Sequence, residues 1–273
     1  MTTHDDLPRL DGWALILGAS SGFGAAASVA LARAGMSILG VHLDRRAGMA
    51  EVERIKGEIG EMGRKAWFFN VNAADERKRA ATLDEIRRRF DEEGERGRVR
   101  VLMHSLAFGT LRPYWTDDPE AQVITKANMD MTLDVMAHSL VYWVQDALRR
   151  GLFGDHGRIF AMTSAGSHTV WPGYGAVGAA KASLEAHVRQ LAVELAPRGI
   201  TANAICAGVT DTPALRKIPG SDRMVEQARA RNPHGRLTTP EDVARAIVAL
   251  STPAAQWISG NTINVDGGED IAG

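Results

Sequence analysis

Residues 13–34 read WALILGASSGFGAAASVALARA, and this stretch decides the fold class. A short apolar run, Trp13–Leu17, ends in glycine, and an alanine-rich segment of helical period follows from Gly24 to Ala34. Gly35, directly after this segment, is typical of a helix end. The stretch therefore predicts a buried strand, a tight glycine turn and a helix.

The same alternation of apolar strands and helical segments continues along the chain. We expect strands at 37–43, 66–69, 99–104, 158–162, 201–205 and 262–265, and helices at 50–62, 75–90, around 131–148 and around 184–195. Strands that alternate with helices predict crossover connections and a mainly parallel, doubly wound α/β sheet. No Pro-, Gly- or Ser-rich linker divides the chain, so we expect a single domain.

Composition narrows the function classes. The 273 residues carry 32 basic and 33 acidic side chains, and this near-neutral balance argues against nucleic-acid binding. No apolar run reaches the ~18 residues of a membrane span, and the polar start is unlike a signal peptide. Cys206 is the only cysteine, which favours a reducing compartment, and we expect a cytoplasmic enzyme. No metal is expected, because no ligand spacing links acids or Cys206 with the histidines His104, His138, His168 and His187.

The turn GASSGFG at 18–24 has the spacing of a dinucleotide-binding loop. Gly18 permits the tight turn, Gly22 lets a pyrophosphate approach the backbone, and Gly24 allows the helix to pack closely on the strand. The N-terminus of the helix then offers free N–H groups to the phosphates. The alternative is a glycine-rich turn that binds no ligand.

The end of the second strand, VHLDRR at 41–46, bears on the type of nicotinamide cofactor. Asp44 is able to bind the ribose hydroxyls of NADH, whereas Arg45 or Arg46 is able to bind the 2′-phosphate of NADPH. In the usual strand length His42 takes the place of the acid that NAD binders carry, so NADPH is favoured and NADH is the alternative. The two arginines also suit a role in surface solubility alone.

A second motif, TSAGSHTVWPGYGAVGAAKASLEAHV, spans residues 163–188. Tyr174 and Lys181 are two helical turns apart and share nearly one face, and Ser164 follows a strand. An ammonium group beside a phenol lowers the pKa of the phenol, and the Tyr and Ser hydroxyls can both hydrogen-bond a carbonyl oxygen that gains charge. Packing and solvent exposure are the alternative roles of such a tyrosine and lysine.

With these residues in view, the chain resembles the short-chain dehydrogenase/reductase superfamily from about Asp11 to Glu269. The resemblance rests on GxxxGxG at 18–24, the Ser164–Tyr174–Lys181 trio, NAICAGVTDT at 203–212 and VDGG at 265–268. It implies a Rossmann-type sheet, usually of seven parallel strands, in a single domain over 11–269 with tails at 1–10 and 270–273.

The seven-residue spacing YGAVGAAK narrows the resemblance, since most of the superfamily uses Tyr-x-x-x-Lys and Val177 occupies that tyrosine position. This spacing, with HSLAFG at 104–109, is similar to that of the enoyl-acyl-carrier-protein reductases. DTPALRKIP, NPHGRL and VDGG resemble their NADPH-dependent branch. The implied cofactor-binding residues are Gly18, Ser20, Ser21, Gly22, Phe23, Gly24, Asp44, Arg45, Arg46, Asn70, Val71, Ser105, Leu106, Ala107, Lys181, Gly208, Val209, Thr210 and Thr212.

The resemblance also implies catalytic roles. Tyr174 would hydrogen-bond a thioester carbonyl, Lys181 would bind the nicotinamide ribose, and Ser164 would lie beside the substrate carbonyl. The apolar helices around 131–148 and 184–195 resemble those that form four-helix interfaces, which implies a homotetramer.

Residues 212–237 are expected to form a substrate lid, because binding loops follow the carboxyl ends of strands. Leu215, Arg216 and Ile218 are its candidate substrate contacts. Its basic side chains suit the acidic surface of an acyl carrier protein or the phosphates of coenzyme A, and a solvated helix is the alternative.

Three functions agree with these residues. The first is NADPH-dependent reduction of the 2,3 double bond of an enoyl thioester, carried by acyl carrier protein or coenzyme A, with Tyr174 stabilising the enolate. The second is a ketone or alcohol oxidoreductase of the same superfamily. The third is a nicotinamide-binding scaffold without turnover.

Overall fold

Seven strands form one all-parallel sheet in the computed structural model, which describes residues 8–95 and 99–272. The strands are β1 (Trp13–Leu17), β2 (Ser37–His42), β3 (Ala66–Asn70), β4 (Val99–His104), β5 (Phe153–Ser164), β6 (Thr201–Ala207) and β7 (Thr262–Val265). Their order is β3-β2-β1-β4-β5-β6-β7, which places the first strand near the middle of the sheet. The prediction of a doubly wound, Rossmann-type α/β fold is confirmed.

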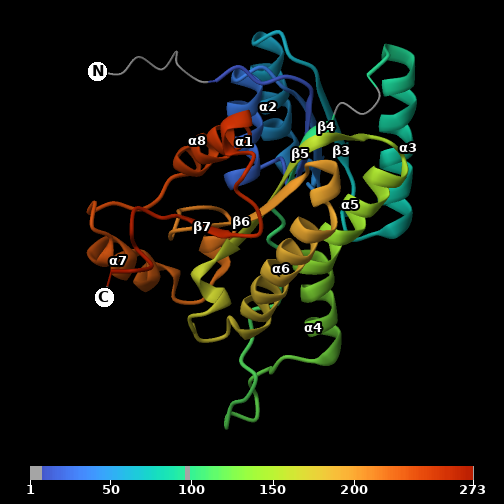
Figure 1. The fold of residues 1–273 in the computed structure, drawn as a ribbon. Coiled ribbons are helices and arrows are strands. Elements are labelled where there is room, and N and C mark those ends of the chain that lie inside the picture. The colour runs from blue at the N-terminus through green and yellow to red at the C-terminus, as the bar shows by residue number, and fades with distance from the viewer. Residues whose placement is uncertain (1–7, 96–98, 273) are drawn as a thin grey trace.

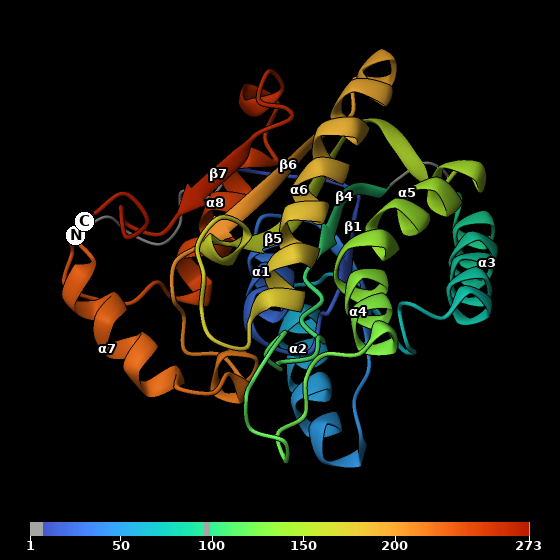
Figure 2. The same ribbon diagram turned by 90° about the horizontal axis from the view of Figure 1, so that it is seen from below.

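Helices cover both faces of this sheet (Figure 1, Figure 2). They are α1 (Gly22–Arg33), α2 (Met49–Glu61), α3 (Glu76–Glu93), α4 (Lys126–Leu133), α5 (Ser139–Arg149), α6 (Gly175–Glu194), α7 (Ser221–Arg231) and α8 (Pro240–Leu250), with a π-helical turn at Asp134–His138. Helices α1, α2 and α8 pack on one face, and α3, α5 and α6 on the other. In both views α7 lies away from the sheet. Within the described ranges, no helix is long and apolar enough to cross a membrane.

The core consists of two apolar layers, one on each side of the sheet. All five residues of β1 and all seven of β6 are buried, as expected for central parallel strands. In one layer Trp13 packs against Trp67 and Phe90, with ring centroids 4.4 and 5.4 Å away. In the other, Leu31 of α1 and Ile247 of α8 are fully buried. The sheet is therefore a rigid support for the loops that follow its strands.

Two elements differ from the sequence-based expectation. Strand β5 begins at Phe153 rather than at 158, because the chain rejoins β4 after an irregular segment in which His156 has a φ of 59°. The helix expected around 131–148 is divided into α4 and α5 by the π-helical turn. Periodicity does not reveal this turn, because its residues are as apolar as the helices beside it.

Candidate functional site

The carboxyl ends of the central strands meet at one edge of the sheet. Leu17 at the end of β1 is paired with His104 at the end of β4, and Ser164 at the end of β5 is paired with Ala207 at the end of β6. This pairing brings the glycine loop and the segments after β4, β5 and β6 to the same edge, where open α/β sheets bind ligands.

The glycine loop is built by close backbone approach. Gly18 has a φ of +92°, and a Cβ there would lie 2.5 Å from the carbonyl oxygen of Ser105. A Cβ at Gly24 would lie only 2.0 Å from the oxygen of Gly18, so α1 packs against the loop in a way that only glycine permits. Ser21 precedes α1 with extended backbone and no capping bond from its side chain, which leaves the first helical N–H groups for another acceptor. This cradle fits a pyrophosphate group.

Thr212 lies next to the same loop, because a Cβ at Gly22 would be 3.5 Å from its methyl group. The structure thus brings the segment after β6 to the glycine loop. Of the other predicted loop residues, Ser20 is half-buried and Phe23 packs partly into the core.

At the end of β2, the half-buried carboxylate of Asp44 is held by neighbouring residues. The Nδ1 atom of buried His42 lies 2.9 Å from Asp44 Oδ2, and a Cβ at Gly48 would lie 2.5 Å from Oδ1. Asn70 exchanges two hydrogen bonds with the backbone of Asp44, at 3.1 and 2.9 Å. Asp44 and Asn70, both expected to bind the cofactor, are therefore in contact, and the Val71 N–H donates to the His42 carbonyl at 2.8 Å.

Arg45 and Arg46, by contrast, are exposed. In the described part of the chain neither side chain forms an ion pair or hydrogen bond. Their two charges are therefore available to an anionic group at the end of β2.

The segments after β4 and β6 form the remaining wall. The Ser105 N–H donates to the Leu17 carbonyl at 2.8 Å, Leu106 packs partly into the core, and Ala107 is exposed. After β6 the Val209 N–H donates to Glu269 Oε1 at 3.1 Å, and the Thr210 hydroxyl donates to the Gly208 carbonyl at 2.9 Å. These bonds fix the backbone of both segments.

Tyr174 occupies the N-cap position of α6 and lies against Ser164, with the two hydroxyl oxygens 3.4 Å apart. Burial raises the pKa of Tyr174, and the hydrogen bond with Ser164 opposes this effect. The phenol is thus neutral at pH 7 and available as a hydrogen-bond donor. Val177, at the position of the more common tyrosine, is buried in the core.

Lys181 is buried on α6, the helix that Tyr174 caps. Its ammonium donates to the Met162 carbonyl at 2.7 Å, and the side chain is buried. Burial lowers the pKa of Lys181 to about 8, while the charge of Glu185 acts in the opposite direction. A buried ammonium of this kind supplies a positive field at the ends of β5 and β6.

The predicted lid contains a 3-10 turn at Leu215–Lys217 followed by α7. Leu215 is buried and Ile218 half-buried, whereas Arg216 is exposed and bound to Asp211 by two contacts of 2.8 and 2.9 Å. The lid touches the loop after β5, because the Trp171 indole donates to the Pro219 carbonyl at 3.2 Å.

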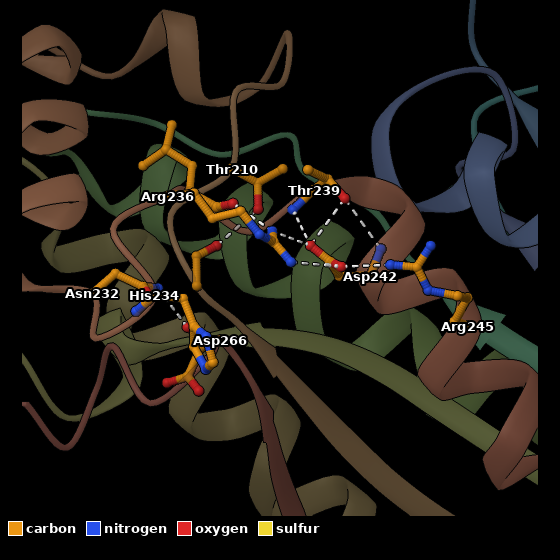
Figure 3. Close-up of polar contacts among 10 residues, drawn as sticks. Thr210, Asn232, His234, Arg236, Thr239, Asp242, Arg245 and Asp266 are labelled. Carbon is orange, nitrogen blue, oxygen red and sulfur yellow. Dashed lines mark hydrogen bonds and ion pairs between the residues drawn. The ribbon is translucent and has the colours of Figure 1, made fainter. Parts of the chain in front are cut away.

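A polar network that the sequence analysis missed joins the end of the lid to the C-terminal segment (Figure 3). Asn232 donates to the Asp266 carbonyl at 2.8 Å, and Arg236 binds Asp242 at the start of α8 at 2.6 Å. Asn232 and Asp266 are 34 residues apart, so no local motif signals their contact. The network fixes the base of the lid.

Two further polar contacts of buried residues were not predicted from the sequence. His104 is fully buried with its Nε2 2.9 Å from the Ser139 hydroxyl, and the Thr163 hydroxyl donates to Glu185 at 2.6 Å. In the ranges that the structure describes, His, Cys, Asp and Glu side chains form no group of three or more that could hold a metal ion.

Known proteins resemble this chain over most of its length. A family model described as enoyl-(acyl carrier protein) reductase matches residues 18–269. The NADPH-dependent aldehyde reductase-like protein, chloroplastic, of Arabidopsis thaliana is 28% identical over 98% of this chain and 99% of its own. The 1-cyclohexenylcarbonyl-CoA reductase of Streptomyces collinus is 30% identical over 94% of this chain and 86% of its own.

Solved structures share the fold. The enoyl-[acyl-carrier-protein] reductase (NADH) of Aquifex aeolicus VF5 superimposes with a TM-score of 0.80 at 24% identity, covering 96% of this chain and 97% of the other. Given the extent of the family match and the dinucleotide cradle, the chain belongs to the enoyl-(acyl carrier protein) reductase family of the short-chain dehydrogenase/reductase superfamily and is an NAD(P)H-dependent oxidoreductase.

Proposed function

We propose that the protein reduces the 2,3 double bond of an enoyl thioester with NADPH. The observation that carries this proposal is the placement of Tyr174 seven residues before Lys181, with its hydroxyl beside Ser164, while Val177 is buried in the core. Family membership and the similarity to a CoA-thioester reductase support the substrate class.

In this reaction the residues of the chain would bind the cofactor and stabilise the enolate. The nicotinamide cofactor, when bound, would supply the hydride to the β-carbon. The glycine loop and Thr212 would hold the pyrophosphate, and Lys181 the nicotinamide ribose. The Tyr174 hydroxyl would donate a hydrogen bond to the thioester oxygen, which gains negative charge as the enolate forms, and Ser164 lies on the same side. A proton from water then reaches the α-carbon and completes the reduction. Hydrogen bonds aimed at developing charge are commonly worth about 100- to 1,000-fold in rate.

Purified protein tests this role of Tyr174. With crotonyl thioester and NADPH, the wild type should consume the reduced cofactor, and Tyr174→Phe should lower kcat by about 100-fold or more while binding NADPH equally well. Equal turnover by the two proteins would exclude Tyr174 from catalysis.

Carbonyl reduction is the second candidate function. It is favoured by the similarity, across nearly the whole chain, to an aldehyde reductase-like protein. Turnover of aldehydes or ketones, without turnover of enoyl thioesters, would establish this function in place of the first.

The preference for NADPH rests on the charges at the end of β2. Because the Asp44 carboxylate is engaged by His42, and Arg45 and Arg46 are exposed, this edge favours a 2′-phosphate over free ribose hydroxyls. The double change of Arg45 and Arg46 to Ala should weaken binding of NADP⁺ by about tenfold or more and leave NAD⁺ binding nearly unchanged, as measured by calorimetry. Arg64→Ala, an exposed arginine after α2, is the matched control. Equal loss for both nucleotides would refute the preference.

Docking of an acyl carrier protein would use the lid. Arg216 is neutralised by Asp211, so the exposed Lys217 and Arg223 are better candidates for an acidic partner. Lys217→Glu with Arg223→Glu should raise KM for the carrier-bound substrate more than for the CoA thioester. A KM unchanged for both substrates would remove the docking role.

A homotetramer is the proposed assembly. Helices α5 and α6 border an outward-facing groove of about 320 Å³, lined by residues such as Tyr142, Leu148 and Leu191. Together with the family resemblance, this groove supports a four-helix contact between two copies.

A further inference from the structure

A pair of hydrogen bonds connects two successive residues of β5 with two residues one turn apart on α6. The Met162 carbonyl accepts from the Lys181 ammonium at 2.7 Å, and the Thr163 hydroxyl donates to Glu185 Oε1 at 2.6 Å. Residues i and i+4 of a helix lie on the same face, so Glu185 is adjacent to Lys181 along α6. Both contacts lie directly before Ser164 on the strand.

We propose that Glu185, oriented by Thr163, is a positioning residue that supplies the counter-charge for the Lys181 ammonium at the reaction site. The proposal rests on the proposed function only for the role of Lys181. The contacts themselves are independent of the substrate.

Burial makes a counter-charge necessary. Lys181 and Thr163 are 6% and 4% exposed, and a buried ammonium loses hydration that only nearby charges or dipoles can replace. The carbonyl of Met162 satisfies one of its three N–H groups. Burial lowers the pKa of Lys181, and Glu185 is the largest influence that raises it.

Two neighbouring groups, His104 and Cys206, interact with Lys181 through their charges, and neither is negative at pH 7. The carboxyl groups of Asp266, Glu269 and Asp270 act on Cys206 and not on Lys181. On β4, burial lowers the pKa of His104 to about 3, and on β6, burial raises the pKa of the Cys206 thiol to about 12, so both are neutral. Burial also raises the pKa of Tyr174 at the start of α6. Two groups raise the pKa of Lys181 through their charge, Glu185 and then Cys206, and the neutral thiol leaves Glu185 as the main one.

The π-helical turn, which packs against α6, carries two more titratable side chains. His138 lies 2.9 Å from His187 on α6, with Nδ1 facing Nε2 across the two helices. Asp134 begins the turn. Neither contributes to the shift of Lys181.

The charge of Glu185 affects the pH at which activity is lost. The charged form of Lys181 supports Tyr174, and it is lost as the pH rises through the pKa of the lysine. Without the charge of Glu185 this pKa falls, so activity is lost at lower pH. The acid side of the profile stays unchanged, because Lys181 is charged there in both proteins.

Glu185→Gln tests the proposal, since it removes the charge and keeps the shape. We expect kcat/KM to fall by about fivefold at pH 8 and by about tenfold at pH 9, and to change little at pH 6, as a displacement of the alkaline limb from about pH 8 by one pH unit requires. Arg189→Gln, which removes an exposed charge on the same helix, should leave the pH profile of the wild type. If kcat/KM of Glu185→Gln were lowered by the same factor at every pH, the role of Glu185 would be merely structural and the proposal would be overturned.

The hydrogen bond from Thr163 is tested separately. Thr163→Val keeps the shape and removes the donor, and it should move the alkaline limb in the same direction as Glu185→Gln. Thr163→Ser restores the hydroxyl and should restore the profile. Equal profiles for Thr163→Val and the wild type would remove Thr163 from the proposal.

A direct titration of Lys181 separates this proposal from the proposed function. In protein with isotopically labelled lysine, the NMR resonance that is lost in Lys181→Arg identifies Lys181, and no substrate is needed. Its titration midpoint should fall in Glu185→Gln. An unchanged midpoint would refute the role of Glu185, whereas a lowered midpoint in a protein that does not reduce enoyl thioesters would refute only the proposed substrate.

Discussion

Two glycines fix the position of the Tyr174 ring. A Cβ at Gly166 would lie 2.4 Å from a ring carbon of Tyr174, and a Cβ at Gly178 would lie 2.6 Å from the carbonyl oxygen of Gly166. The turn after β5 and the first turns of α6 thus touch through their backbones, and the phenol lies against this contact. The orientation of the hydroxyl toward Ser164 depends on this close contact.

Gly166→Ala should therefore displace the ring. We expect kcat to fall by about 100-fold, because a misplacement near 1 Å can cost that much, while the protein stays folded. Steady-state kinetics and circular dichroism measure the two effects. In Gly57→Ala, where a Cβ on α2 meets nothing within 4 Å, activity should stay at the wild-type level and stability should rise by about 1 kcal/mol. Wild-type kcat in Gly166→Ala would contradict the role of this contact.

The site residues that could be predicted from the sequence are those that lie close together along the chain. Tyr174, Lys181 and Ser164 could be predicted because one helix and one strand end hold them within 18 residues. The partners of His104 and Thr163 are 35 and 22 residues away, on the helices α5 and α6. Contacts of that kind depend on the pairing of strands with helices, which spacing alone does not specify.

At the scale of elements, α8 begins with a complete capping box. The Thr239 hydroxyl accepts from the Asp242 N–H at 3.2 Å, and Asp242 Oδ2 accepts from the Thr239 N–H at 2.9 Å. Hydrogen bonds from Arg236 and then from Thr239 hold the pKa of Asp242 well below its usual range. This start is important for the fold, because α8 packs against α1, the helix that begins at the glycine loop.

Loss of this cap should lower the stability of the whole domain. Thr239→Ala is expected to reduce the free energy of unfolding by about 1 kcal/mol at pH 7, and Thr239→Ser should retain most of the wild-type stability.

Because the pKa of Asp242 is lowered by folding, the contribution of its carboxylate to stability is full above about pH 4 and is lost at lower pH. The difference in stability between wild type and Asp242→Asn should thus narrow below about pH 4. Denaturant titrations measure both effects, and a constant difference would contradict the role of the carboxylate.

The elements themselves were largely predictable. Apolar runs located every strand of the sheet, since buried parallel strands are continuously apolar. Their ends were less certain, as at β5, where residues 153–157 join the strand through an irregular pairing. The division between α4 and α5 was not predictable either, because a π-helical turn changes hydrogen bonding without changing composition.

In the molecule as a whole, the order of the strands brings segments that are far apart in the sequence to one site. The glycine loop, the β2 end, and the segments after β4, β5 and β6 are separated along the chain, yet β1, β4, β5 and β6 are successive neighbours in the sheet. The sequence predicted the parallel sheet, and the resemblance supplied the expected strand number. The arrangement of side chains within the site needed the three-dimensional contacts.

His104 makes the stability of the molecule dependent on pH. Burial lowers its pKa from 6.5 to about 3, so the unfolded chain takes up a proton that the folded protein does not. Its contribution to stability is therefore full above pH 6.5 and is lost as the pH falls toward 3. We expect this group to reduce the free energy of unfolding by up to about 1.4 kcal/mol per pH unit in that range. Urea titrations from pH 7 to pH 4 should show a weaker slope in His104→Gln, and an equal slope would contradict this origin.

The proposed assembly is tested on the intact protein. Light scattering should give about four times the chain mass of 29.4 kDa. Leu148→Glu in the groove between α5 and α6 should lower this mass, since a buried charge at an interface is strongly unfavourable. Val170→Glu, on the exposed loop after β5, is the matched control and should keep the tetramer mass. A monomer mass for the wild type would refute the assembly.

The π-helical turn gives this part of the chain room to vary in length by one residue. Such a turn adds a residue to a helix, and the Ser139 hydroxyl at its end donates to the Val135 carbonyl while it contacts His104. Its five residues turn through about the same angle as four residues of an α-helix at about 100° each. Loss of one residue within 134–138 would therefore close an ordinary helix and leave the residues that follow facing nearly the same way. Relatives without the π-helical turn should thus be one residue shorter here and keep the face of α5 that packs on the core.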